Sequence, residues 1–532
     1  MWTLWLLWLS SISLSSAEGV NPKPKVWSSQ TTIVDDEVHC PDYSSFAYSN
    51  HTPASVGRFQ LSYQRPAPAC RTFNLSEVEE TILTMKRAIR DPDLFRLFEN
   101  CFPNTLDTAI AWRGKGDGEH GRKTEELTFI TTGDINAMWL RDSANQLQSY
   151  RSLLRANASS HSLASLFRGA INLQARYVAS HPHCNAFHAP PEADLALPFT
   201  SGMNDYITPS PEPSVVFECK YELDSLAAFL QLSHDYFAGT GDAAFFGKHR
   251  WLEAVGALVN ATADLLGGTY SRDGSVAYSS YLFQRTTSSA YETLGNGGLG
   301  APVKEGTGMV RSAFRPSDDA CTFQLFVPAN MMFSRYLGLC ADIADKLGKR
   351  GMARSMRRFS ASIKAGIEKH GRVNHRLYGK IYAYEVDGYG SFNAMDDANI
   401  PSLLSAPMFG YVDRNDPIYL STRRFVLSKD NPYFMFGPVI NSTGGPHVGP
   451  GMAWPMSLIV RILTTDDDAE IVESLKQLLS STNGLGLIHE SINTHDQSVW
   501  TRQWFSWANG LFGQMILDLR ERKPYLLTLS YQ

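Results

Sequence analysis

The stretch "TTGDINAMWLRDSANQLQSY" (residues 131–150) leads from a cluster of polar and aromatic side chains into a helix. Beyond Asp142, apolar residues recur at the three- and four-residue spacing of a helix with one buried face, at Ala144, Leu147, Tyr150 and Leu154. We therefore expect a helix over residues 142–155 with Asp142 as its N-cap. Because one small side chain is enough to cap a helix, Trp139 and Arg141 directly before it need a second explanation.

The same kind of opening recurs along the chain, where a loop with acidic or aromatic residues runs into an apolar helix. It is seen in "LRDSANQL", "ELDSLAAFL", "PSDDACTFQLF" and "MDDANIPSLL", at Asp142, Asp224, Asp318 and Asp396, and again after Pro450 and near Trp504. Between these segments lie helices with a polar face, such as "EIVESLKQLL". Six inner helices alternating with six outer ones predict an all-α fold, an (α/α)6 barrel whose inner-helix N-termini meet at one rim.

Helical patterns dominate the rest of the chain. We expect helices at residues 75–98, 142–155, 163–179, 225–238, 250–266, 319–347, 352–369, 398–405, 417–427, 452–464, 467–481 and 505–521. Strand-like alternation is confined to short pieces such as "KIYAYEVDGYGS" (residues 380–391). The sequence therefore predicts only short, local β-hairpins beside the helices.

Composition indicates a globular protein with one large domain. Of the 532 residues, 43% are hydrophobic and only 19% charged, which is enough to bury a large core. A net charge of -5 gives no electrostatic reason to expect nucleic-acid binding. We expect residues 1–17 to be a signal peptide, residues 18–74 an N-terminal extended arm, and residues 75–532 the (α/α)6 domain.

The N-terminus and the sequons point to the secretory pathway. The segment "MWTLWLLWLSSISLSSAEG" has an apolar run followed by small residues, which suits a cleaved signal peptide. A basic leading region is missing, so an uncleaved membrane anchor is the alternative, although the run is shorter than the roughly 20 residues that span a membrane. Asn-x-Ser/Thr sequons lie at Asn50, Asn74, Asn157, Asn260 and Asn441. We predict a glycoprotein of the secretory pathway whose expected location is extracellular, with the vacuole or the Golgi lumen as alternatives. We do not expect it to be stably inserted in a membrane.

The cysteines favour disulfides over zinc. None of the seven, Cys40, Cys70, Cys101, Cys184, Cys219, Cys321 and Cys340, belongs to a C-x-x-C motif. The sequence does not determine their pairing, and their odd number leaves at least one unpaired. A catalytic thiol is the less favoured alternative, because no cysteine lies in a nucleophile motif.

Carboxylates, arginines and flat aromatic rings at one rim suit a carbohydrate, which offers hydroxyls and apolar C–H faces. Hydrolysis of a glycosidic bond needs one carboxylic acid to protonate the leaving oxygen and one carboxylate to activate water or attack carbon. Asp224 and Glu490 are the strongest candidates, although Asp224 could simply cap a helix and Glu490 could simply pair with Arg502. The acid pairs at 318–319 and 396–397 lack the spacing of a calcium loop, so no metal or cofactor is expected.

Taken together, six segments of the chain resemble glycoside hydrolase family 125. They are "GDINAMWLRDSANQ", "KYELDSL", "SAFRPSDDACTFQLFVPANM", "MDDANIPSLL", "HESIN" and "TRQWFSWANGLFG". The resemblance runs from about residue 75 to the end of the chain. A Gly-rich insertion around residues 293–308 and the N-terminal arm depart from it.

This resemblance implies an inverting exo-α-1,6-mannosidase on an (α/α)6 barrel that needs no metal, with Asp224 as general acid and Glu490 as general base. It also implies that Arg141, Asp142 and residues 315–319 hold the terminal mannose. The expected substrate-binding residues are Asp134, Trp139, Arg141, Asp142, Tyr221, Glu222, Arg315, Asp318, Asp319, His489, Asn493, Arg502 and Trp504. The expected partner is a glycan with terminal α-mannose, bound by a monomer. The alternatives are another (α/α)-barrel glycosidase, either an α-glucosidase or a Ca²⁺-dependent α-1,2-mannosidase, and a lectin without catalysis.

Overall fold

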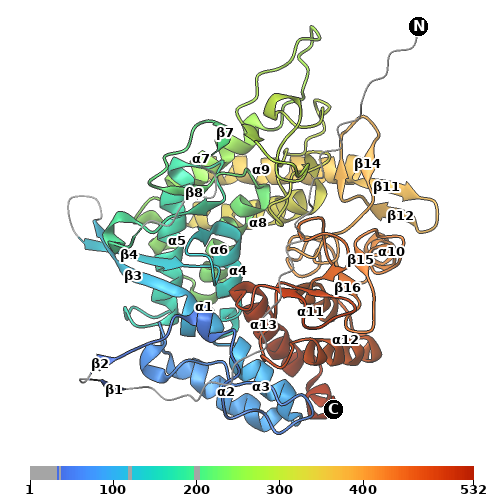
Figure 1. Cartoon of the computed structure of the whole chain (residues 1–532). Coiled ribbons are helices and arrows are strands. Elements are labelled where there is room, and N and C mark those ends of the chain that lie inside the picture. The colour runs from blue at the N-terminus through green and yellow to red at the C-terminus, as the bar shows by residue number, and fades with distance from the viewer. Residues whose placement is uncertain (1–32, 35–36, 118–122, 197–203) are drawn as a thin grey trace, which may run out of the picture.

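Helices are the main regular elements of the structure (Figure 1), a computed structural model that describes residues 33–34, 37–117, 123–196 and 204–532. The helices are α1 (Tyr43–Phe46), α2 (Ser76–Ala88), α3 (Pro92–Cys101), α4 (Leu140–Gln148), α5 (Leu163–Ser180), α6 (Leu223–Thr240), α7 (Trp251–Asp264), α8 (Val327–Lys346), α9 (Arg350–Gly366), α10 (Pro417–Val426), α11 (Pro455–Leu463), α12 (Asp468–Ser480) and α13 (Ser506–Arg522). Most of the helices expected from the apolar periodicity are present within a few residues of their predicted ends.

The strands are short and pair antiparallel in sheets of two or three strands. They are β1 (Ile33–Val34), β2 (Glu37–Val38), β3 (Ile110–Asp117), β4 (Lys123–Ile130), β5 (Met138–Trp139), β6 (Ala186–Phe187), β7 (Asp205–Thr208), β8 (Val216–Glu218), β9 (Leu282–Arg285), β10 (Leu325–Phe326), β11 (Arg372–His375), β12 (Gly379–Tyr382), β13 (Glu385–Val386), β14 (Phe392–Asn393), β15 (Phe434–Met435), β16 (Ser442–Thr443), β17 (Met452–Ala453), β18 (Ser491–Asn493) and β19 (Trp500–Thr501). Several precede a buried helix directly: β5 leads into α4, β10 into α8 and β17 into α11. These small sheets therefore fix where the buried helices begin.

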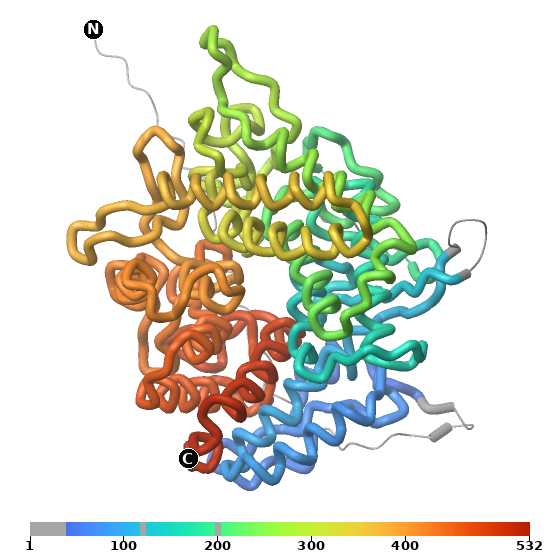
Figure 2. The backbone as a smooth tube through the Cα atoms, turned by 180° about the vertical axis from the view of Figure 1, so that it is seen from behind, coloured from blue at the N-terminus to red at the C-terminus, as the bar shows by residue number. Residues whose placement is uncertain are grey.

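Five helices, α4, α6, α8, α11 and α13, are buried almost all round and pack on one another. Helix α4 packs between α13 and α6, α6 packs on α8, and α11 packs on α13. Figure 1 shows α13 and α4, from opposite ends of the chain, side by side in the middle of the molecule. Amphipathic helices cover this inner set; for example, α9 lies along α8 (Figure 2) and α12 along α11. The fold is thus helix-rich, with inner and outer helices and small antiparallel sheets.

The helix expected at residues 75–98 is two helices, α2 and α3, in the structure, and the one expected at 142–155 ends at Gln148. Two further expected helices differ from the structure. The helix predicted from residue 319 begins only at Val327, and residues 398–405 form turns rather than a helix. In that second segment, the carboxylate of Asp396 accepts hydrogen bonds from the backbone N–H groups of Leu403 and Leu404. Pro401 also lacks the N–H that a helix would use. Hydrogen bonds to the buried Asp396 therefore stabilise turns in this segment, although its apolar periodicity is typical of a helix.

The predicted N-cap role of Asp142 is wrong. Helix α4 begins at Leu140 with Trp139 at its N-cap, which places Asp142 inside the first turn. Helix α6 likewise begins at Leu223, with Asp224 in its first turn. Within the described part of the chain, no N-cap side chain hydrogen-bonds to the start of α4, α6, α8, α11 or α13, whereas side chains cap the peripheral helices α3, α5, α10 and α12. The acids at the inner-helix N-termini are therefore free for a role other than capping.

The segment before α2 is fastened to the body of the protein. A disulfide joins Cys40 to Cys70. The guanidinium of Arg65 lies between the carboxylates of Asp107 and Glu79. The ring of Tyr43 packs edge-on against Trp504 near the other end of the chain.

A second disulfide joins Cys184 to Cys219, and Cys101, Cys321 and Cys340 are unpaired and buried. The expected signal peptide lies outside the described residues. Within the described ranges, no helix is both long and apolar enough to cross a membrane. Of the sequon asparagines, Asn74, Asn157 and Asn260 are exposed, and Asn50 and Asn441 are half-buried. Glycosylation of all five remains a prediction.

Candidate active site

A cavity of about 180 Å³ lies at the N-terminal ends of α4, α11 and α13. Segments from widely separated parts of the chain meet there: β5 and the start of α4, the loop before α8, the 396–409 turns, and the strands before α13. Its walls are Thr132, Ile135, Trp139, Arg141, Asp142, Pro316, Ser317, Asp318, Asn399, His447, Trp454, Glu490, Arg502, Phe505 and Trp507. Carboxylates, cations and aromatic rings thus face one small space, which is the chemistry that a sugar ring requires.

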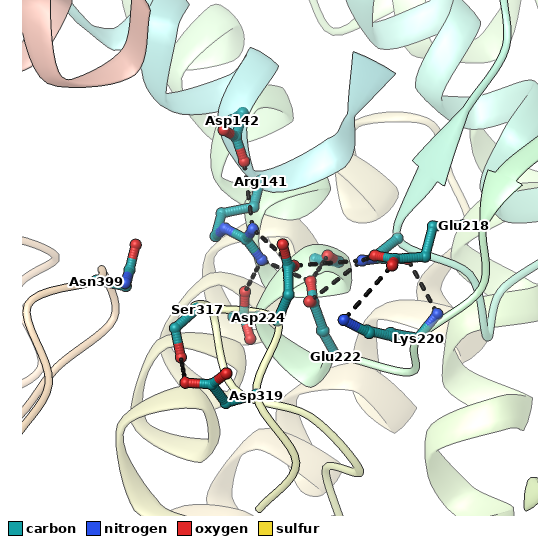
Figure 3. A network of polar contacts seen from close by, with 12 residues as sticks. Arg141, Asp142, Glu218, Lys220, Glu222, Asp224, Ser317, Asp319 and Asn399 are labelled. Atoms are coloured by element: carbon teal, nitrogen blue, oxygen red, sulfur yellow. Dashed lines mark hydrogen bonds and ion pairs between the residues drawn. The ribbon is translucent and has the colours of Figure 1, made fainter. Parts of the chain in front are cut away.

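Arg141 is the centre of one wall (Figure 3). Its Nη1 donates to Glu222 Oε2 at 2.5 Å and to Asp224 Oδ2 at 3.3 Å. Its Nη2 lies 3.4 Å from Asp318 Oδ1 and 3.3 Å from Asp142 Oδ2. Four acids therefore surround one guanidinium, and all but Asp318 are almost fully buried.

These four acids differ in their access to the cavity. Asp318 has 23% of its side chain exposed and Asp142 has 6%, and both line the cavity. Glu222 and Asp224 have no exposed side-chain surface and stand behind Arg141. Asp224 was expected to be the general acid, but it does not reach the cavity.

Burial raises the pKa of Asp224 to about 6, as expected for a carboxyl in an acid-crowded site, although Arg141 counteracts the effect. Burial also raises the pKa of Asp142 to about 6, with Asp318 and Glu490 adding to the rise and Arg141 opposing it. The pKa of Glu222 lies well above its usual value because of burial and its acidic neighbours. For Asp318, Arg141 and Lys220 outweigh burial, and its pKa is lowered. Among these four acids, Glu222 therefore has the strongest tendency to keep a proton and Asp318 the weakest.

Glu490 lies in the cavity wall just before β18. It is 8% exposed, accepts a hydrogen bond from Thr501 Oγ1 at 2.9 Å, and lies 3.5 Å from Arg502 Nη1. Arg502 Nε in turn donates to Asp134 Oδ1 at 2.8 Å. Asp134 therefore orients Arg502, and Arg502 in turn positions the carboxyl group of Glu490 in the cavity wall.

Two cavity residues have left-handed backbone conformations. The φ angle is 64° at Asp318 and 51° at Arg502, and neither is a glycine. Such conformations are uncommon for side-chain-bearing residues and are concentrated at functional sites, where the surrounding structure must hold them. Both residues are therefore held by the fold in positions that the local sequence does not favour.

His447 carries a further positive charge to the cavity. Its Nδ1 lies 3.3 Å from Asp319 Oδ1. Burial by itself would lower the pKa of His447, but the hydrogen bond to Asp319 and the charges of Asp319, Glu490 and Asp318 raise it to about 9. His447 is therefore protonated at neutral pH.

Six of the residues predicted from the sequence meet at this cavity: Trp139, Arg141, Asp142, Asp318, Glu490 and Arg502. The others lie behind its walls or away from it. Tyr221 packs on Tyr281, and Arg315 donates from Nε to Glu385 at 2.7 Å. Asp134, Glu222, Asp224 and Asp319 contact residues of the wall.

Three residues of the C-terminal motifs do not reach the cavity. The ring of His489 is fully buried, stacks on Trp500 and hydrogen-bonds to the backbone, and burial lowers its pKa to about 4. Asn493 caps the turn at residues 495–496, and Trp504 donates from Nε1 to Asn104 at 3.1 Å. Phe505 and Trp507 take the position in the cavity wall that was expected for Trp504.

The sequence missed several wall residues: Thr132, Ile135, Asn399, His447, Trp454, Phe505 and Trp507, whereas Pro316 and Ser317 belong to the predicted segment 315–319. Most of them adjoin residues that were predicted, so proximity to the motifs was the available signal. His447 is different, because "STGGPHVGPG" carries no helix start or acidic cluster. Only its contact with Asp319 identifies it.

A larger cavity of about 550 Å³ lies between β3, β4, α5 and α6, lined by Lys115, Thr124, Glu126, Ala156, Asn157, Ala158, Ser160, Arg168, Tyr236, Asp242 and Lys248. It holds a single aromatic side chain and none of the residues predicted from the motifs. Its larger volume alone does not make it a better candidate active site than the cavity at the helix N-termini. Among the described residues, no cluster of three or more His, Cys, Asp or Glu side chains is arranged to hold a metal ion.

Comparisons with known proteins agree with this geometry. The sequence profile of the family described as metal-independent α-mannosidase (GH125) matches residues 91–517. The chain is 47% identical over 490 residues to the meiotically up-regulated gene 157 protein of Schizosaccharomyces pombe, covering 92% of this chain and 94% of that protein. It is similar in structure to a metal-independent α-mannosidase of Streptococcus pneumoniae, solved in a non-productive complex with α-1,6-mannobiose. The TM-score is 0.73 at 31% identity, over 85% of this chain and 100% of that one.

Proposed function

Because the chain belongs to the metal-independent α-mannosidase family GH125, which confirms the resemblance of its motifs, we propose that it is an exo-acting, inverting α-1,6-mannosidase. One observation carries the mechanism: Asp318 and Glu490, from loops far apart in sequence, line the same small cavity with Arg141 and aromatic rings. Paired carboxyl groups across a sugar site are what glycosidic hydrolysis needs.

In this mechanism, Asp318 is the general acid and Glu490 the general base. Asp318 gives a proton to the glycosidic oxygen as the bond to the anomeric carbon breaks. Glu490 takes a proton from a water that attacks that carbon from the opposite face. We assign the acid to Asp318 rather than Asp224, because a proton donor must reach the glycosidic oxygen and Asp224 has no exposed surface.

The size of the cavity supports exo-action. Pockets for drug-sized ligands measure about 300 Å³ or more, so a cavity of about 180 Å³ suits one terminal sugar ring. Arg141, Asp142 and Arg502 would hold the mannose hydroxyls, and Trp139, Trp454 and Trp507 would face its C–H surfaces. The α-1,6 preference rests on the relative from Streptococcus pneumoniae, whose complex contains α-1,6-mannobiose.

The finer architecture is proposed with the function. Five inner helices, α4, α6, α8, α11 and α13, are present, and the turns at residues 396–409 lie in the chain where a sixth, between α8 and α11, would be. This arrangement suits an (α/α)6 barrel in which the turns replace the fourth inner helix. We propose that residues 75–532 form the catalytic domain, that residues 18–74 form an arm, and that the protein is a monomer that follows the secretory pathway. The two disulfides are compatible with that route.

Inversion predicts the anomer that is formed first. An inverting enzyme leaves room for water between its base and the sugar, with carboxyl groups roughly 6.5–9.5 Å apart. We expect ¹H NMR to show β-mannose as the first product from α-1,6-mannobiose, before mutarotation. If α-mannose were formed first, Glu490 would be a nucleophile and the mechanism would be retaining.

Metal independence separates the proposal from a Ca²⁺-dependent α-1,2-mannosidase. We expect the rate of mannobiose hydrolysis to be unchanged after exhaustive EDTA treatment and gel filtration, because the cavity wall offers carboxylates already paired with arginines. A loss of activity that only Ca²⁺ restores would favour the calcium enzyme. Comparing α-1,6-, α-1,3- and α-1,2-mannobiose and an α-glucoside tests the linkage, and a lectin would turn over none of them.

A further inference from the structure

A general acid at position 318 needs a way to keep its proton. Asp318 faces Arg141, Lys220 and His447, and these cations favour its carboxylate form. An isolated aspartate in that field would be ionised at neutral pH and could not protonate a leaving group. The structure therefore has to supply the proton from a neighbouring group.

Glu222 is the carboxyl that stands directly behind Asp318. The amide Nδ2 of Asn185 lies 3.1 Å from Glu218 Oε2, 3.2 Å from Glu222 Oε1 and 3.5 Å from Asp318 Oδ1, so it contacts both members of the pair as well as Glu218. Because Asn185 Oδ1 accepts from the backbone N–H of Lys220 at 3.0 Å, the amide can only turn its Nδ2 toward these acids. Arg141 reaches the same pair with both of its Nη atoms. The two carboxyls are thus held together by shared donors.

Burial and the surrounding acids disfavour two carboxylates in this pair. Arg141 alone meets four acids, Lys220 is shared with Glu218 at 3.4 Å, and His447 is paired with Asp319. A hydrogen bond between the side chains of Glu222 and Asp318 raises the pKa of the first and lowers that of the second. The charged groups facing the pair are Arg141, Asp142, Glu218, Lys220, Asp224, Arg285, Asp319 and His447.

We propose that Glu222 is a positioning residue that shares a single proton with Asp318 and passes it to Asp318 when the glycosidic bond breaks. This inference rests on the proposed function. In each turnover, the Glu222 carboxyl gives its proton to Asp318 as Asp318 protonates the leaving oxygen, which leaves two carboxylates. The attacking water gives a proton to Glu490, and exchange with solvent then removes that proton from Glu490 and returns one proton to the pair. The sum is one glycoside and one water converted to free mannose, a hemiacetal, and the leaving alcohol.

The test is the pH profile of Glu222→Gln. The variant keeps the shape of the side chain but has no acidic proton, and its amide favours the Asp318 carboxylate. Because the acid must be protonated, activity falls as pH rises through the pKa of the pair. We expect the alkaline limb of kcat/KM on α-1,6-mannobiose to move down by about one pH unit or more. Hydrolysis of 2,4-dinitrophenyl α-mannoside, whose leaving group needs no proton, should be retained.

Asp235→Asn is the matched control. Asp235 is another buried carboxyl of α6, bonded to Gln148 at 2.8 Å and far along the helix from the cavity. The Asp235→Asn variant should have lower thermal stability, but the alkaline limb of its kcat/KM pH profile should not move. An unchanged limb in Glu222→Gln, or equal loss on both substrates, would overturn the proposal.

A measurement on the wild-type protein keeps the test independent of folding. With ¹³C-labelled glutamate carboxyls, NMR should show one glutamate still protonated at neutral pH; if all were ionised, the shared proton would not exist. If the wild type hydrolyses neither substrate, the proposed function itself fails. If it hydrolyses both and Asp318→Asn loses only mannobiose, a normal profile in Glu222→Gln refutes the proton pair alone.

Discussion

Replacing Asp318 with asparagine is expected to lower kcat/KM for α-1,6-mannobiose by about 10²–10⁴-fold, the usual contribution of a general acid. The amide fills the same volume and still meets Arg141, so mannose binding should survive. On 2,4-dinitrophenyl α-mannoside the loss should be less than about tenfold, because that leaving group departs without a proton. Steady-state kinetics on the two substrates give the comparison directly.

Asp224→Asn is the counterpart that decides between the two aspartates. Asp224 contacts Arg141 but has no exposed surface, so its amide variant should keep a substantial rate on both substrates. The opposite pattern, with mannobiose hydrolysis lost in Asp224→Asn and kept in Asp318→Asn, would return the acid role to Asp224. It would also mean that the site rearranges when substrate binds.

Replacing Glu490 with alanine is expected to be as severe, with a loss of about 10²–10⁴-fold on both substrates, because water must be activated whatever the leaving group. Azide needs no base, so it should restore turnover and give β-mannosyl azide. Mass spectrometry and NMR identify that product. Equal loss on mannobiose and the dinitrophenyl glycoside distinguishes the base from the acid.

Asp496→Asn is the control for Glu490. It removes an exposed acid from the same β18–β19 loop. There the Asp496 carboxylate accepts hydrogen bonds from the backbone N–H and the hydroxyl of Ser498. Its kinetics should match the wild type. Recovery of activity in Glu490→Ala through an α-linked azide would indicate attack from the other face and would contradict inversion.

Much of the fold could be read from the sequence because helix formation depends on neighbours three and four residues apart. Helix α5 (Leu163–Ser180) was expected at residues 163–179, and α10 (Pro417–Val426) at 417–427. Where the prediction failed, a long-range or side-chain interaction replaced the local one. Asp396, for example, binds the backbone of residues 403–404 and prevents a helix there.

The sequence predicted which kinds of side chain line the cavity, but not which individual side chains face it. The motifs gave the cluster of acids, arginines and aromatic rings, since an acid beside an aromatic residue before a helix is visible in the chain itself. Which of these side chains faces the cavity depends on the residue at which each helix begins. With α13 starting at Ser506, the cavity wall takes Phe505 and Trp507 and leaves Trp504 against Asn104.

By itself, then, the sequence determined a helix-rich glycosidase with its acids before the inner helices, because those features follow from local periodicity and residue chemistry. The tertiary structure decided which side chains reach the cavity. Asp318 reaches the cavity through a left-handed backbone conformation, while Asp224 is screened by Arg141. Arg502 is oriented by Asp134, 368 residues away. Burial and charge at such contacts set which acid holds a proton, and they exist only once distant segments have packed together.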